Sequence, residues 1–392
     1  MVMNSPHSAL PHRGTISGLD SLRGLAILMV LIAHSNTDYT PWHGVVRLVL
    51  RAATAGALGV HLFYVLSGFL ISGILIDSKR SKTYFSTFYV RRALRILPAY
   101  TLMIVVLKAA HIISWKFTLA CFLYVANMAS IVGANTGEYG PFWSLAVEEQ
   151  FYIVWPLVIR RFSLDGIRRT IYLVCLVSPL IRGLSKLNSL DAYYKAWDNC
   201  DYLMYGALIA LFLRDGTINS MNIRRLYRFM FGVGSLLCSA LVYWRWSGDP
   251  LSPAKEAALS AVGILPFTLV AVALVLRAIA SNVNRHRTGP LIFLGYISYG
   301  LYLVHQLIFE LYDKIFAHTP LGGYESSIRV LVLRDTIVIS ISIGVAYLSR
   351  RFFEDPFLRK KAIFAPNSTP ELQWIAVPDD LAIGRPALTD RH

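Results

Sequence analysis

The sequence predicts an all-α polytopic membrane protein in which about ten transmembrane helices surround a polar cavity. Of the 392 residues, 55% are hydrophobic and only 16% are charged, and the mean hydropathy is +0.51. A soluble domain typically has about 25% charged residues, so this composition excludes one. A further indication is a series of apolar stretches of the length that a helix needs to cross a bilayer, about 20 residues each.

Ten such stretches follow one another along the chain. Their approximate bounds are 17–35, 56–76, 96–114, 143–160, 169–184, 201–213, 229–246, 257–276, 291–312 and 330–349. The stretch 201–213 is short and would need a tilted or thinned position in the bilayer. We predict one membrane domain over 16–361, between a cytoplasmic tail at 1–15 and a disordered cytoplasmic tail at 362–392.

A further apolar segment, 117–131, decides the predicted topology. It is short and carries Asn127. If it does not cross the bilayer, 23 of the 38 Lys and Arg residues fall on one side. Because basic residues collect on the cytoplasmic side, both termini are then predicted to be cytoplasmic. If the segment crossed the bilayer, every later loop would lie on the opposite side, and the excess of basic residues on one side would disappear. We therefore interpret the segment as re-entrant or peripheral.

The net charge of +15 and the pI near 9.7 are explained by this topology and by contact with anionic lipid. A nucleic-acid partner is therefore not predicted. The four cysteines lie far apart and show neither metal-ligand spacing nor a disulfide framework, so no metal is predicted. Arg23 interrupts the first apolar stretch, and His-Ser-Asn follows it, which is unlike a cleavable signal peptide.

Three ionisable residues, Asp20, Arg23 and His34, lie in the first apolar stretch. In an α-helix, Arg23 and His34 fall within about 20° of one face and about 16 Å apart. Asp20 joins the same stripe. Ionisable groups in hydrocarbon are costly and usually face a bundle interior or a wet path. The stretch therefore predicts a polar seam, with Arg23 toward one side of the membrane and His34 toward the other.

The fourth stretch carries two adjacent carboxylates, Glu148 and Glu149. They lie about 8 Å inside a helix that begins at Trp143 and diverge by about 100°. One of them is expected to face His34 and the other to bond to a neighbouring helix, and either assignment is open. Both could also be packing residues. A histidine base, an orienting carboxylate and a hydroxyl nucleophile together suggest acyl transfer.

Three arginines, Arg91, Arg92 and Arg95, cluster at the start of the third stretch. Guanidinium groups match phosphate oxygens in a bidentate way that lysine cannot, so a phosphate site is one interpretation. The alternative is a cytoplasmic anchor of snorkelling side chains.

Two polar residues in other stretches have two interpretations each. His61, at a depth similar to that of His34, is either an interior hydrogen-bonded residue or part of the site. Asp201 either lines the outer vestibule or stabilises a helix N-terminus. The pair Ser67-Gly68 suggests close helix packing.

Ser298, Tyr302 and His305 recur at helical spacing in the ninth stretch and form a second polar stripe. We expect it to face the first stripe across the bundle. Arg334 and Asp335, near the outer end of the tenth stretch, are interpreted as snorkelling residues.

Seven motifs occur in one order over residues 16–357: LDSLRGLAILMVLIAHS, GVHLFYVLSGFLI, YVRRALRILPAY, FWSLAVEEQFYIVWPL, DYLMYGALIA, LGYISYGLYLVHQ and FFEDPF. Together they resemble the acyltransferase 3 family of integral membrane O-acyltransferases, which act on carbohydrates. The resemblance implies that an acyl group, commonly acetyl, moves from cytoplasmic acyl-CoA to a hydroxyl of a carbohydrate or glycoconjugate. It also implies a bacterial inner-membrane location, with acyl-CoA as co-substrate.

The family's functional residues carry over to matching positions of this sequence. Its catalytic histidine matches His34, its motif arginine Arg23, and its loop arginines Arg91, Arg92 and Arg95. The element Trp-Ser-Leu-x-x-Glu-x-x-Tyr matches Trp143, Ser144, Leu145, Glu148 and Tyr152. His34, Glu148 and Arg23 are thus the predicted catalytic residues. The residues predicted to line the cavity are Asp20, His61, Trp143, Glu149, Tyr152, Asp201, Ser298, Tyr302 and His305.

The predicted mechanism docks the CoA phosphates on the three loop arginines and threads the pantetheine arm past Arg23. His34 then deprotonates an acceptor hydroxyl or carries the acyl group itself. Some family members append a periplasmic transferase domain; because this chain has none, the whole reaction is expected in the membrane domain or with a partner. The competing prediction is a non-catalytic exporter of glycolipid or polysaccharide. A structural scaffold would not explain the charged residues inside the spans.

Overall fold

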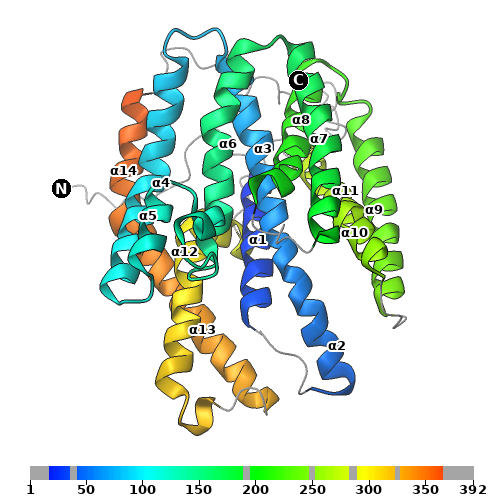
Figure 1. The fold of residues 1–392 in the computed structure, drawn as a ribbon. Coiled ribbons are helices and arrows are strands. Elements are labelled where there is room, and N and C mark those ends of the chain that lie inside the picture. The colour runs from blue at the N-terminus through cyan, green and yellow to red at the C-terminus, as the bar shows by residue number, and fades with distance from the viewer. Residues whose placement is uncertain are drawn as a thin grey trace, which may run out of the picture.

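The computed structural model describes residues 17–35, 42–188, 195–246, 252–281, 289–322 and 327–364, and within these ranges all regular structure is helical. The predicted tail at 1–15 and nearly all of the one at 362–392 lie outside the described residues. The long helices run side by side in one bundle (Figure 1), so the expected all-α class is confirmed.

The described helices alternate long segments with short helical turns. The α-helices are α1 Ser17–Ser35, α2 Gly44–Ala53, α3 Leu58–Ser78, α4 Tyr84–Ala109, α5 Trp115–Phe122, α6 Pro141–Arg161, α7 Leu164–Leu187, α8 Cys200–Arg214, α9 Ile223–Trp246, α10 Pro253–Val262, α11 Leu265–Ala280, α12 Pro290–Phe316, α13 Ile328–Leu348 and α14 Asp355–Arg359. The short turns are η1 Thr54–Ala57, η2 Ala126–Val132, η3 Ala196–Asp198, η4 Pro320–Gly322, η5 Ser349–Glu354 and η6 Lys360–Phe364.

Seven described helical segments are long and apolar enough to cross a membrane, which makes the chain an integral membrane protein. They are α1, α2 with α3, α7, α9, α10 with α11, α12, and α13 with α14. The expected spans near 96–114, 143–160 and 201–213 correspond to α4, α6 and α8, which are not among them. Charged side chains lower the apolar character of α4 and α6, and α8 has only 15 residues. The expected number of about ten is therefore not confirmed.

The apolar segment 117–131 forms α5 and η2, of 8 and 7 residues. At 1.5 Å per residue an eight-residue helix spans about 12 Å, far less than the hydrocarbon core of a bilayer. Figure 1 shows α5 beside α4. Helix α5 alone is thus too short to cross, and the re-entrant or peripheral placement of the segment stays a prediction.

Helices α1, α3 and α6 occupy the middle of the bundle, with α7 to α11 on one side and α4, α12, α13 and α14 on the other (Figure 1). The closest packing joins α3 to α8 and α1 to α12. A Cβ atom on Gly68 would lie 1.9 Å from the Leu203 carbonyl oxygen, and one on Gly206 would lie 2.0 Å from that of Val65. Small residues let helix backbones approach in this way, so the close packing predicted from Ser67-Gly68 is confirmed.

Adding one methyl group at this crossing should be destabilising. We expect Gly68→Ala to lower the unfolding free energy by about 1–3 kcal/mol, because the new Cβ would overlap the backbone of α8. Gly344→Ala is the matched control, since a Cβ on Gly344 of α13 has no atom within 4 Å. Thermal unfolding in detergent measures both; equal melting temperatures for the two variants would contradict the assigned crossing.

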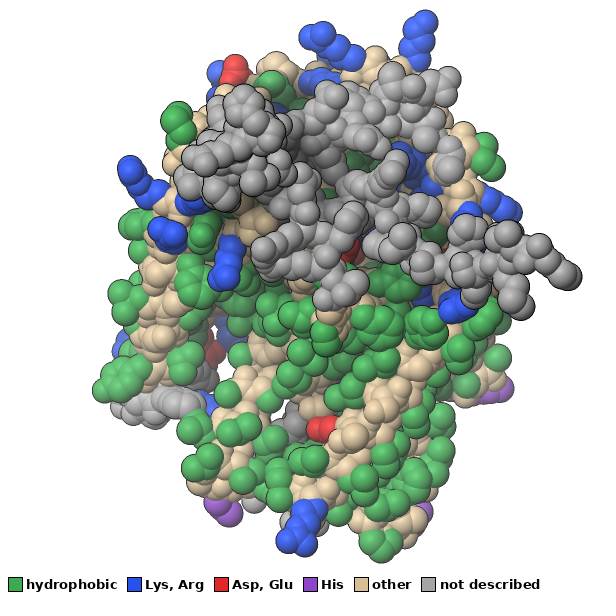
Figure 2. Space-filling view, turned by 180° about the vertical axis from the view of Figure 1, so that it is seen from behind, with side chains coloured by type: hydrophobic (Ala, Val, Ile, Leu, Met, Phe, Trp, Pro, Cys, Tyr) green, Lys and Arg blue, Asp and Glu red, His purple; other side chains and the backbone are tan. Residues whose placement is uncertain are grey.

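Basic side chains gather at the end of the bundle where α3, α6 and α8 end, which we call the basic end. Lys79, Arg80, Arg160 and Arg161 lie there. Figure 2 shows most of the visible Lys and Arg side chains toward this end and hydrophobic side chains over much of the remaining face. We call the opposite end, where α1 ends and α13 begins, the far end.

Candidate active site

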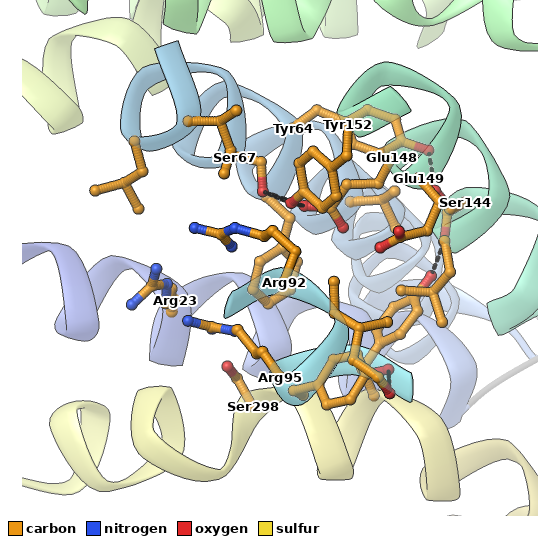
Figure 3. Close-up of a pocket in the computed structure, with 18 residues that line it drawn as sticks. Arg23, Tyr64, Ser67, Arg92, Arg95, Ser144, Glu148, Glu149, Tyr152 and Ser298 are labelled. Carbon is orange, nitrogen blue, oxygen red and sulfur yellow. Dashed lines mark hydrogen bonds between the residues drawn. The ribbon is translucent and has the colours of Figure 1, made fainter. Parts of the chain in front are cut away.

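A pocket inside the bundle collects polar residues from five helices, α1, α3, α4, α6 and α12 (Figure 3). Its polar lining residues are Arg23, Tyr64, Ser67, Arg92, Arg95, Ser144, Glu148, Glu149, Tyr152, Ser298, Tyr299 and Tyr302. Eight of them were predicted from the sequence as catalytic, donor-binding or cavity-lining residues. The structure therefore brings together polar residues that lie up to 279 positions apart, from Arg23 to Tyr302.

The cationic part of the pocket is built from α1 and α4. The side chains of Arg23, Arg92 and Arg95 extend toward the same region (Figure 3). Arg23 pairs with Asp20 at 2.8 Å. Arg92 lies over the ring of Tyr152, with its guanidinium carbon 5.5 Å from the ring centroid. Within the described chain, neither Arg92 nor Arg95 forms an ion pair with a carboxylate.

Arg91 does not line the pocket. It precedes Arg92 on α4, and neighbouring helical residues point about 100° apart. Arg92 and Arg95 are one helical turn apart and share a face. The arginine cluster recognised in the sequence is therefore divided by the helix, with two of its three members turned inward.

The carboxylates of the pocket come from α6. Glu148 accepts hydrogen bonds from the hydroxyls of Ser67 on α3 and Tyr152 one turn further along α6. Glu149 lines the same pocket. Both adjacent glutamates thus reach the cavity, while the hydrogen bonds of Glu148 link α6 to α3. This differs from the expectation that only one of the two would face inward.

His34, at the far end of α1, is oriented by its own helix. Its Nδ1 atom lies 2.9 Å from the carbonyl oxygen of Val30. Because a carbonyl only accepts hydrogen bonds, Nδ1 carries the proton and Nε2 of the neutral ring has a lone pair. The structure does not form the expected pair of His34 with Glu148 or Glu149, because the bonds of Glu148 go to Ser67 and Tyr152.

The ring that contacts His34 is that of His305 on α12. The two ring centroids lie 4.9 Å apart with an interplanar angle of 82°. Close packing of α1 on α12 sets this contact, since a Cβ on Gly295 would lie 1.9 Å from the Asp20 carbonyl oxygen. The two polar stripes therefore face each other as the sequence predicts.

The second stripe connects the pocket with His34. Ser298 and Tyr302 line the pocket, and the Tyr302 hydroxyl lies 2.5 Å from that of Ser144. The rings of Tyr302 and His305 are 5.7 Å apart, and His305 contacts His34. His34 does not itself line the pocket. The rings of Tyr302 and His305 thus lie between the pocket and His34.

Arg334 has a structural role that the sequence interpretation missed. Its side chain is only 3% exposed, binds both carboxylate oxygens of Asp313 at 2.7 Å, and also pairs with Asp335 at 3.1 Å. It donates a further hydrogen bond of 2.7 Å to the carbonyl oxygen of Ser35, the residue after His34. The snorkelling interpretation of Arg334 is wrong. Asp313, near the end of the preceding apolar stretch, was the sequence signal for such a partner.

Four other candidates, Asp20, His61, Trp143 and Asp201, lie outside the pocket, and Asp20 adjoins it only through its ion pair with Arg23. Asp201 pairs with Arg182 at 3.0 Å and accepts a hydrogen bond from Ser178, which joins α7 to α8 inside the bundle. The ring of His61 packs on that of Tyr202 at 4.4 Å. Trp143 is buried but is not a lining residue. The ion pair of Asp201 and the ring contact of His61 join neighbouring helices.

The chain after α13 closes on the basic end of α4. Segments η5, α14 and η6 all pack against α4. Arg350 pairs with Glu354 and Asp355 there, at 3.4 and 3.2 Å. Burial and the charges of Arg95, Arg92, Arg350 and Arg91 lower the pKa of Lys361 to about 6. The basic end of the pocket is therefore rich in positive charge.

Comparison with known proteins identifies relatives over most of the chain. Residues 16–351 match the family model Acyl_transf_3, described as an acyltransferase domain. The chain is 28% identical over 383 residues to "Putative O-acetyltransferase SACOL0978" of Staphylococcus aureus (strain COL), covering 91% of this chain and 59% of that protein. It is 26% identical over 377 residues to "O-acetyltransferase OatA" of Staphylococcus aureus (strain NCTC 8325 / PS 47), covering 89% and 58%.

This chain thus spans about three fifths of the length of these relatives. No solved structure matches it. In the described part of the chain, no three His, Cys, Asp or Glu side chains come together in a way that could hold a metal ion. The match of the family model to residues 16–351, together with the membrane helices, shows that the chain belongs to the acyltransferase 3 family.

Proposed function

We propose that this chain is an O-acyltransferase that moves an acyl group from cytoplasmic acyl-CoA to a hydroxyl of a carbohydrate or glycoconjugate. The proposed acyl group is acetyl. One observation carries the proposal. Arg92 and Arg95 reach into a pocket without a direct ion pair among the described residues, and Tyr302 and His305 lie between that pocket and His34, whose Nδ1 is bonded to Val30 and whose Nε2 carries the lone pair. The names of the relatives support acetyl as the group transferred.

Arg92 and Arg95 bind the phosphate groups of the donor in this proposal. Two inward guanidinium groups that form no direct ion pair among the described residues favour an anionic ligand, and their fork geometry suits phosphate oxygens. The acylated pantetheine arm extends from there along the pocket, past Arg23, Ser67 and the carboxylate of Glu148. Glu148 holds Ser67 and Tyr152 in place by its two hydrogen bonds and so shapes this channel.

His34 acts as the general base at the other end of the path. Its Nε2 lone pair takes the proton of the acceptor hydroxyl. The hydroxyl oxygen bonds to the acyl carbon, the carbon–sulfur bond breaks, and the departing thiolate receives the proton. The products are the acyl ester and CoA with a free thiol, and His34 returns to its neutral form.

The proposal includes a bacterial cytoplasmic membrane crossed about ten times, with both termini in the cytoplasm. Helices α4, α6 and α8 then cross along with the seven apolar segments. They lie lengthwise among the other long helices (Figure 1). The basic end, with Lys79, Arg80, Arg160 and Arg161, faces the cytoplasm in accordance with the positive-inside rule.

The direct test uses the purified full chain in lipid nanodiscs with acetyl-CoA labelled in the acetyl group. We expect free CoA to appear, and the label to reach glycolipid or polysaccharide extracted from cells that lack the gene. Mass spectrometry of these glycans identifies the acetylated hydroxyl. A carrier without catalysis would leave acetyl-CoA intact, and that result would replace the proposal by the exporter alternative.

The protein should also take up a proton, at Lys361, when it binds CoA. At pH 8 the amine of Lys361 is mainly neutral, because its pKa is lowered to about 6 by burial and by Arg95, Arg92, Arg350 and Arg91. Bound phosphates supply negative charge that favours the ammonium form. We therefore expect the calorimetric enthalpy of CoA binding at pH 8 to vary with the ionisation enthalpy of the buffer.

Lys361→Arg should abolish this buffer dependence and retain binding, because arginine is already charged at pH 8. The control is Lys82→Arg, at an exposed position of the same end of the bundle. Binding of CoA without proton uptake by the unmodified protein would separate Lys361 from the donor site.

A further inference from the structure

The structure holds His305 in the same tautomer as His34. Its Nδ1 atom lies 2.8 Å from the carbonyl oxygen of Tyr302 and 3.2 Å from that of Leu301. Both carbonyls accept hydrogen bonds, so Nδ1 carries the proton. The neutral ring of His305 therefore has its lone pair on Nε2, as does the ring of His34.

The Nε2 atom of His305 has no hydrogen-bond partner among the described residues. It is fully buried, and the whole residue is 0% exposed. Buried polar atoms are nearly always hydrogen-bonded, and an exception calls for an explanation. A hydrogen-bond donor that forms at another stage of the reaction would satisfy this atom.

The adjacent ring of His34 can become that donor. The centroids of the two rings lie 4.9 Å apart with an interplanar angle of 82°, so the rings are in contact, and a rotation of the His34 ring would bring its Nε2 to the hydrogen-bond length of about 2.9 Å from Nε2 of His305. While both rings are neutral, each Nε2 has only a lone pair, and no hydrogen bond can form between them. Protonation of His34 at Nε2 creates the missing N–H group.

The position of His34 relative to His305 is fixed from two sides. On the basic-end side of the histidines, α1 packs closely on α12 at Gly24 and Gly295. A Cβ on Gly24 would lie 1.8 Å from the Leu291 carbonyl oxygen. At the far end, Arg334 binds the carbonyl oxygen of Ser35 and the carboxylate of Asp313. The helix that carries His34 is thus attached to the helix that carries His305 on both sides of the histidine contact.

We propose that His305 is a positioning residue that acts through His34, by accepting a hydrogen bond from the protonated ring. This inference rests on the proposed function and deepens it. The proton leaves the acceptor hydroxyl, binds Nε2 of His34 and is shared with the lone pair of His305. It then passes to the sulfur of the departing thiolate, and both rings are neutral again. No redox partner is needed.

The test compares two replacements of His305 in the full chain, with acetyl-CoA turnover as the readout. His305→Met fills the space without a strong acceptor, and His305→Gln places a carbonyl oxygen where it can approximate Nε2. We expect His305→Met to lower kcat about 10- to 100-fold, the range of a lost hydrogen bond to a charged group, with an unchanged KM for acetyl-CoA. His305→Gln should recover part of the loss.

The variants are also combined with His34→Ala. Because His305 acts only through His34, we expect His305→Met to cause no further loss in that background. A wild-type kcat in His305→Met, equal losses in the Met and Gln variants, or a further loss in the double variant would each overturn the inference. Melting temperature and CoA binding of each preparation show that the protein is folded.

The failure of this inference is distinguishable from that of the proposed function. If the unmodified protein turns over acetyl-CoA and His305→Met does so equally fast, only the role of His305 is wrong. If the unmodified protein does not turn over acetyl-CoA, the proposed function is wrong and the role of His305 with it.

Discussion

Replacing His34 by alanine is expected to lower the rate of acyl transfer by about 10²- to 10⁴-fold, the usual contribution of a positioned general base. The ring lies at the far end of α1 with Nδ1 bonded to Val30, which leaves Nε2 as its proton acceptor. No other group is expected to replace it, because the adjacent His305 is fully buried. The measurement is the rate of acetyl-CoA turnover by the purified protein.

The dissociation constant of CoA should hardly change in His34→Ala, since His34 does not line the pocket that holds the arginines. Measuring the dissociation constant beside the turnover rate therefore shows whether the variant has lost catalysis or CoA binding. His34→Gln is the conservative companion; it retains a polar side chain but not a basic nitrogen and should be similarly slow. Wild-type turnover by either variant would exclude His34 as the base.

The second large effect is expected when Arg92 and Arg95 are both replaced by glutamine. A hydrogen bond to a charged group contributes about 1.5–3 kcal/mol, so each arginine should account for about 10- to 150-fold in CoA affinity. The two side chains share one pocket (Figure 3), and their effects need not add. Calorimetric or filter-binding titration of CoA gives the change in dissociation constant.

The matched control for this double variant is Arg161→Gln, an exposed arginine at the end of α6. It removes a positive charge from the basic end without changing the pocket. If Arg161→Gln weakened CoA binding as strongly as loss of Arg92 and Arg95, general electrostatic attraction would explain the binding. If the double variant bound CoA normally, the arginines would be membrane anchors, the alternative considered from the sequence.

Some features of the site could be predicted because they depend on one helix at a time. Helical periodicity placed Arg23 and His34 on one face, and Ser298, Tyr302 and His305 on another. The structure brings these two faces together. Their polar side chains interrupt otherwise apolar helices, so burial against a second polar surface was the favourable arrangement.

The same polar residues account for part of the difference between the ten expected spans and the seven apolar segments. Helices α4 and α6 carry the arginines and glutamates of the pocket, and these lower the hydropathy by which crossing helices are recognised. The role of Arg334 was missed for a related reason. Its depth in the sequence suits a snorkelling side chain, whereas its burial depends on Asp313, which belongs to a different helix.

The amino-acid sequence determined the membrane class, the helical architecture and the residues worth examining, because hydrophobic length, charge distribution and helical period are properties of the chain itself. Only the tertiary structure decided which polar groups meet. Glu148 bonds to Ser67 and Tyr152, and His34 contacts His305 instead of a glutamate. These pairings depend on which helices are neighbours and how each is rotated about its axis, and close contacts such as that of Gly295 with the backbone of Asp20 set both.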